Sequence, residues 1–139
     1  MKFMTKDLVY FAVAAIVLTL VFRFTLSAML TNEWYISVII PATLYGCSMF
    51  VAGWYFGFKD GRELPIYDVG FRFHFTTYVS FHAVSSAWFL LGLNANTEKW
   101  KSLAIGALIW GFFLAVHFIF FMNCKKKAID GLDKKELFD

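Results

Sequence analysis

Four long apolar segments make up most of this chain, and short polar stretches separate them. Each is at least as long as the roughly 20 apolar residues that a helix needs to cross the hydrocarbon core of a bilayer. Arg23 is the only charged residue inside any of them. Hydropathy therefore predicts four membrane-spanning helices, at Leu8–Met29, Tyr35–Phe58, Phe73–Leu93 and Leu103–Asn123.

Composition agrees with this interpretation, because 60% of the 139 residues are hydrophobic. The segments between the predicted helices are too short to bury a core of their own. We therefore expect one domain, residues 1–139, that is an all-α integral membrane four-helix bundle. The sequence has no phosphate-binding loop, hydrolase motif or metal-ligand spacing, which favours a protein that is not an enzyme and has no metal site.

Basic residues are unevenly distributed about the predicted helices. Lys99 and Lys101 lie on one side of a four-helix arrangement. The residues on the opposite side are Lys2, Lys6, Lys59, Arg62, Arg72, Lys125, Lys126, Lys127, Lys134 and Lys135. The positive-inside rule then places both termini in the cytoplasm, as in a bacterial inner membrane protein. The short Lys125–Lys127 cluster suits lipid headgroups, and we expect no nucleic-acid partner.

Two residues are unusual inside predicted helices. Pro41 removes one backbone hydrogen bond, so we expect it to kink the second helix. Arg23 lies about 9 Å short of the end of the first helix, where a charge is costly unless it is paired. No acidic residue occurs inside a predicted span. The expectation for Arg23 is therefore snorkelling towards a phosphate of the headgroups, with backbone carbonyls, hydroxyls or Tyr78 as the other candidate partners.

The third predicted helix carries the densest set of polar side chains. His74, Tyr78, His82 and Ser85 fall within about 80° of arc on a regular helix. Lipid cannot satisfy these groups, so we expect this polar stripe to face the bundle interior or a subunit interface. His82 and His117, which is on the fourth helix, are expected at similar depth. Packing, proton or substrate handling, and bis-histidine haem ligation all stay open for this pair.

Small residues predict where helices approach closely. Ala107, Gly111 and Ala115 form a ladder at four-residue spacing, and Gly53 and Gly57 form a second pair. Such patterns allow two helix backbones to come together, either within one chain or between subunits. Besides the lipid bilayer, we therefore expect a second copy of the chain or another membrane protein as partner.

Aromatic residues and histidines recur at fixed places in the second half of the chain. The pattern consists of Phe71, His74, Tyr78, Trp100, Trp110-Gly111 and His117. In this respect residues 71–121 resemble the bacterial two-transmembrane (2TM) domain family. The asparagine expected after the tyrosine is replaced around His82. The resemblance implies a small accessory or signalling module without an established reaction, and it does not cover residues 1–58.

The sequence thus favours a non-enzymatic inner-membrane protein that works through helix–helix association and has no cofactor. Two alternatives stay open. The polar stripe and Arg23 are compatible with an oligomeric pore, a transporter-like protein or a membrane effector. His82 and His117 are compatible with a haem-binding membrane redox protein.

Overall fold

The computed structural model describes residues 4–62 and 64–130, and within these ranges the chain is all-helical and contains no strand. This confirms the predicted all-α class. The four α-helices are α1 (Lys6–Thr31), α2 (Ile39–Asp60), α3 (Ile66–Leu90) and α4 (Trp100–Asp130), and a short 3₁₀ helix, η1 (Ile36–Val38), precedes α2. Lys2, Lys134 and Lys135, which contributed to the predicted topology, lie outside the described residues.

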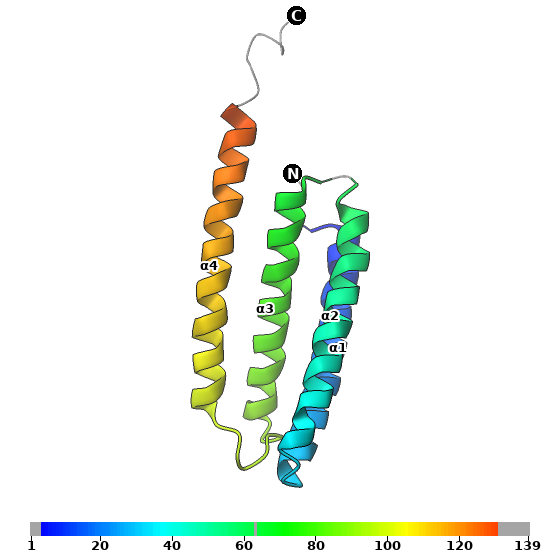
Figure 1. Ribbon diagram of the computed structural model, residues 1–139, viewed down its shortest axis with the longest axis vertical. Coiled ribbons are helices and arrows are strands. Elements are labelled where there is room, and N and C mark those ends of the chain that lie inside the picture. The colour runs from blue at the N-terminus through cyan, green and yellow to red at the C-terminus, as the bar shows by residue number, and fades with distance from the viewer. Residues whose placement is uncertain (1–3, 63, 131–139) are drawn as a thin grey trace, which may run out of the picture.

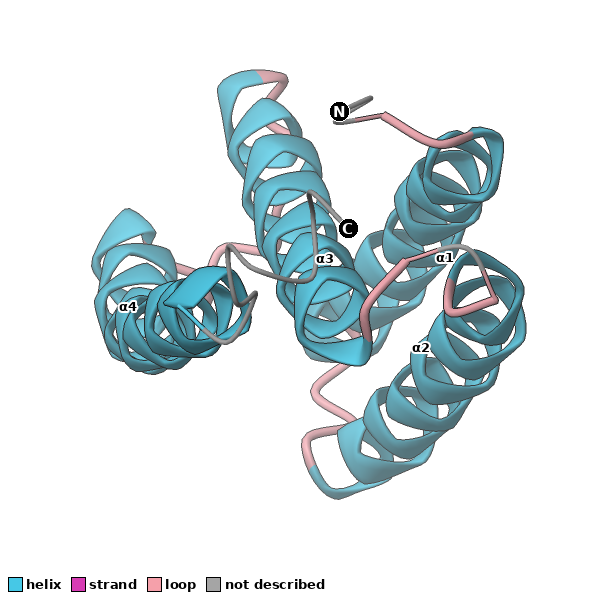
Figure 2. Ribbon diagram, turned by 90° about the horizontal axis from the view of Figure 1, so that it is seen from above, coloured by secondary structure: helices cyan, strands magenta, loops and turns pink. Residues whose placement is uncertain are grey.

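The helices run side by side, and α3 lies between α4 and the α1–α2 pair (Figures 1 and 2). The α1–α2 and α3–α4 connections meet at one end, here called the Glu98 end. The α2–α3 connection lies at the other, here called the Asp60 end, and α4 extends past α3 there. Among the described helices, α4 contacts α3 and neither α1 nor α2. The arrangement is therefore a three-helix core with α4 added on one side.

One face of α1 is buried from end to end. Its buried residues recur every three or four positions, which is the spacing that places side chains on one helix face. They are Leu8, Phe11, Ala15, Thr19, Arg23 and Ser27. The apolar half of this face packs with Met49 of α2 and with Val69 and Phe73 of α3 to form the core near the Asp60 end.

The beginning of α1 is tied to the end of α2. Thr5 caps α1 by accepting a hydrogen bond from the Leu8 amide at 3.1 Å. The same hydroxyl donates to a carboxylate oxygen of the buried Asp60 at 2.5 Å. A cap of this kind typically contributes about 1 kcal/mol, so this contact holds two helix ends in register.

Among the described residues, three helical segments are long and apolar enough to cross a membrane: α1, residues Ile36–Asp60, and α4 from Trp100 to Lys127. The segment predicted at Phe73–Leu93 corresponds to α3, which differs from the prediction in its limits and is less apolar than the other three. The helix begins at Ile66 and ends at Leu90, and it does not reach the hydropathy of the other three. The reason is its content of histidine, serine, threonine and tyrosine, which is tolerable because α3 has helices on both sides.

The ends of the other helices also differ from the prediction. Pro41 lies in the first turn of α2, where a missing amide hydrogen costs nothing because first-turn amides have no helical partner. In place of the kink expected inside the helix, a 3₁₀ turn precedes it. At the Asp60 end, α4 continues to Asp130, seven residues beyond the predicted limit at Asn123.

Candidate functional site

Arg23 is the most deeply placed cation among the described residues of α1, and it is paired. Its side chain forms an ion pair and a hydrogen bond with Glu98, which lies in the α3–α4 connection. Both side chains are at least nine-tenths buried. The expected snorkelling to headgroups is therefore replaced by an internal ion pair, because Glu98 approaches the helix from the neighbouring loop.

Further hydrogen bonds hold the Glu98 carboxylate in place. Ser27, one turn beyond Arg23 on α1, donates to the carboxylate at 2.7 Å. Its hydroxyl in turn accepts a hydrogen bond from the indole of Trp88 on α3 at 3.0 Å. The guanidinium also lies 5.4 Å from the centre of the Phe89 ring. This network joins α1, α3 and the α3–α4 connection, and we call it the Glu98 network.

Sequence reasoning missed Glu98 because it searched for acids inside the predicted spans only. A signal was available. Glu98 belongs to the short connection at the end of the chain's helices where Arg23 also lies. An acid within reach of a deep arginine is its natural partner, since isolated charges at that depth are expensive.

A second buried ion pair lies at the Asp60 end. Arg72 donates to both carboxylate oxygens of Asp68 on the same helix, at 2.9 and 2.6 Å. Both side chains are almost fully buried. Arg72 was counted from the sequence as a residue at the membrane surface, but it belongs to the buried face of α3. Because both carboxylate oxygens of Asp68 pair with Arg72, the positive charge of Arg72 is neutralised at this buried position.

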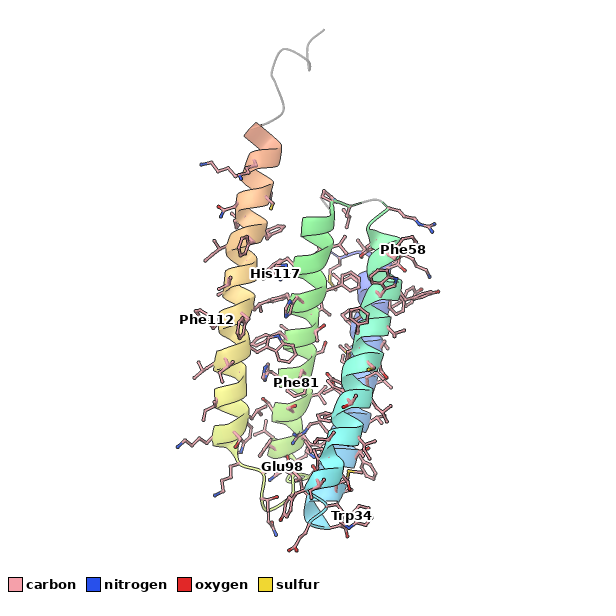
Figure 3. All side chains as sticks on the ribbon, in the orientation of Figure 1. Trp34, Phe58, Phe81, Glu98, Phe112 and His117 are labelled. Carbon is pink, nitrogen blue, oxygen red and sulfur yellow. The ribbon has the colours of Figure 1, made fainter. Side chains whose placement is uncertain are left out.

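The polar stripe lies mostly against α4, as residues of both helices show. His74 accepts a hydrogen bond from the Trp110 indole at 3.1 Å, and its ring meets the ring of His117 edge to face at 5.3 Å. Tyr78 donates to the backbone carbonyl of Ala107 at 3.2 Å. Figure 3 shows His117 on the side of α4 that faces α3 and Phe112 on the opposite side.

His82 is surrounded by aromatic rings. Those of Tyr78, Phe81 and Trp110 lie within 4.5 to 5.7 Å of it, centre to centre. Neither ring nitrogen of His82 has a hydrogen-bond partner, and the same holds for the hydroxyl of the fully buried Ser85. In this respect the two residues at the Glu98 side of the stripe differ from His74 and Tyr78.

The expected pairing of His82 with His117 was wrong. His117 packs against His74, which lies two helical turns, or about 12 Å, from His82 along α3. Distances along the two helices give His82 and His117 a similar depth only if Arg72 and Lys125 lie at one level. Arg72 is buried, and α4 runs on past Lys125, so these two residues do not mark one plane. No group of three or more metal-ligating side chains occurs among the described residues.

The small-residue ladder on α4 meets a tyrosine of α3. A β-carbon placed on Gly111 would lie 3.3 Å from the Tyr78 hydroxyl, which is tighter than ordinary contact. Gly111 therefore makes room for the Tyr78 ring, while Ala115 farther along the ladder is exposed. Gly53 and Gly57 of α2 are less constrained, since their β-carbons would meet side chains at 3.8 and 3.6 Å.

Comparison with known proteins adds no relative. No protein family, no characterised protein and no solved structure matches this chain. The resemblance of residues 71–121 to the 2TM family therefore stays an expectation from the residues. A function for the chain has to be inferred from its own chemistry and geometry.

Proposed function

We propose that this chain is a non-enzymatic protein of a bacterial inner membrane, with both termini cytoplasmic, and that it acts as an accessory or signalling module through association of its helices. The observation that carries the proposal is the position of α4. This helix is held by α3 alone among the described helices, and large apolar side chains cover the rest of its surface. The 2TM resemblance supports the same role.

The exposed surface of α4 is the surface that we assign to a second copy of the chain. Phe113 and Phe120 are 60% and 65% exposed, and Cys124 on the same helix face is exposed as well. Aromatic side chains of this size supply contact area between membrane helices through van der Waals packing. Arg23 and Arg72 do not take part in this surface, because each is paired with an acidic residue of its own chain.

The two cysteines of the chain provide the test. Cys47 lies on α2 and Cys124 on α4, and both are exposed free thiols. Oxidation of native membranes should give a disulfide-linked dimer with the wild-type protein and with Cys47→Ser, and none with Cys124→Ser. Particle mass in nanodiscs formed directly from those membranes should exceed that of one chain. A single chain per nanodisc together with no cross-link would contradict the proposal.

The oligomeric pore, transporter-like or effector function and the haem-binding redox function have tests of their own. Ion flux into liposomes that contain the purified protein would favour the first. A Soret band in the absorption spectrum of the purified protein would favour the second, although His82 and His117 lie in different contacts here. The association proposal expects neither signal.

A further inference from the structure

A groove lies between α1 and α4, with α3 as its floor. Its volume is about 610 Å³, within the range of small-molecule sites. The groove exists because α1 and α4 do not contact each other, so it opens sideways, where the surrounding side chains are apolar. Figure 3 labels Glu98 at its mouth and Phe81 farther inside.

The polarity of the groove changes along its length. Its mouth, at the Glu98 end, is lined by Arg23, Glu98, Lys99, Tyr35 and Ser102. Its interior is lined mainly by apolar and aromatic side chains, with Trp110 at the far limit on α4. Trp110 lies ten residues from the beginning of α4, or about 15 Å. That is half of the roughly 30 Å hydrocarbon core, so the groove is as deep as one leaflet.

The charges at the mouth favour an anion. Arg23 and Glu98 neutralise each other, and Lys99 leaves a net charge of +1 among these three residues. Lys99 directly precedes Trp100, the first residue of α4, where unpaired backbone amides and the helix dipole favour negative charge. Arg23 is only 5% exposed, lines the groove, and has an Nε with no hydrogen-bond partner.

From these observations we infer that the groove between α1 and α4 binds one anionic phospholipid of the leaflet at the Glu98 end. Its phosphate lies beside Lys99 and Arg23, and one acyl chain lies along Phe81 towards Trp110. Headgroup and chain thereby meet the polar and apolar parts of the groove in the order in which a bilayer presents them. The inference rests on the membrane insertion that belongs to the proposed function, and is independent of association between copies.

Two pairs of variants test it. Lys99→Glu reverses a charge at the mouth, and Lys101→Glu makes the same change two residues away, outside the groove. Gly106→Leu places a side chain in the groove, and Gly46→Leu makes the same change on α2, outside the groove. A β-carbon at either glycine meets no atom within 4 Å, so both positions have room for the first carbon of a new side chain.

The full chain would be reconstituted in vesicles of phosphatidylcholine and phosphatidylglycerol, extracted in mild detergent, and examined for retained lipid by native mass spectrometry. We expect the wild type to retain phosphatidylglycerol preferentially. Lys99→Glu should lower the retention of phosphatidylglycerol about tenfold, because it replaces an attraction to the anionic headgroup with a repulsion. Gly106→Leu should lower the retention of both lipids. Lys101→Glu and Gly46→Leu should resemble the wild type.

Two results would overturn the inference. Equal loss in Lys99→Glu and Lys101→Glu would indicate general attraction to an anionic surface, and full retention in Gly106→Leu would show that no lipid occupies the groove. Carbonate extraction of the same membranes separates the two proposals. A chain that carbonate releases is not inserted, which refutes the proposed function, whereas an inserted chain without retained lipid refutes only the lipid site.

Discussion

Breaking the Arg23–Glu98 ion pair from one side should destabilise the protein strongly. Both side chains are buried, and two unit charges 4 Å apart interact by about 4 kcal/mol at an effective dielectric constant of 20. Removing one member of a buried pair typically costs about 3–5 kcal/mol, because the other charge stays behind without a partner. Glu98→Gln keeps the size of the side chain and an oxygen that accepts from Ser27. We therefore expect a loss near the lower limit, about 3 kcal/mol.

Two control variants test whether the lost stability comes from a buried charge left without a partner. Glu33→Gln removes a negative charge at the same end, from an exposed side chain, and should change stability by less than about 0.5 kcal/mol. Combining Glu98→Gln with Arg23→Met removes both charges, and it should restore most of the lost stability, since replacing a whole buried pair is often neutral.

Unfolding by sodium dodecyl sulfate in mixed micelles, followed by the fluorescence of the five tryptophans, gives the free energies. The expected order is wild type and Glu33→Gln first, the double variant close behind, and Glu98→Gln last. If Glu98→Gln unfolds with the wild-type free energy, the pair does not hold α1 to the α3–α4 connection. If the double variant is as unstable as the single one, the cost is not that of an unpaired charge.

Three further outcomes are expected, two from contacts within the molecule and one from the distribution of basic residues. Gly111→Leu should lower stability by about 1–3 kcal/mol by colliding with Tyr78, whereas Gly46→Leu should not, as the same unfolding assay would show. His82→Leu should be tolerated at least as well as His82→Asn, because the imidazole has no hydrogen bond to lose and an amide would be left unpaired in the same place; the reverse order would reveal a polar partner. Reporter fusions at the C-terminus and within Asn94–Thr97 should lie on opposite sides of the membrane, and a periplasmic C-terminus would refute the topology.

The helices could be predicted from the sequence more readily than their limits. Long uncharged runs identify α1, α2 and α4 directly, because such runs are rare outside membranes. The third helix was predicted to begin at Phe73, after the charged Arg72, whereas α3 begins at Ile66, directly after Pro65. Proline is tolerated where a helix begins, and Asp68 one turn before Arg72 neutralises its charge within the helix.

The candidate site was only partly predictable for a different reason. Helical spacing correctly groups His74 with Tyr78 on one face of α3, because that is local geometry. Which residue of α4 lies opposite depends on how far α4 slides along α3, and no local rule sets that. The stagger of the two helices brings His117 to His74 and leaves Trp110 beside His82.

The least apolar helix is also the one that connects the others, and these two properties have one cause. On α3, Trp88 bonds to Ser27 of α1, and Tyr78 bonds to the Ala107 carbonyl of α4. In lipid, each of these polar groups would lack a partner and would oppose insertion. Within the folded chain, they join α3 to a helix on either side. A substitution that separates α4 from α3 therefore exposes polar groups as well as apolar surface, so Gly111→Leu should impair membrane insertion of α3 in addition to loosening the contact with α4.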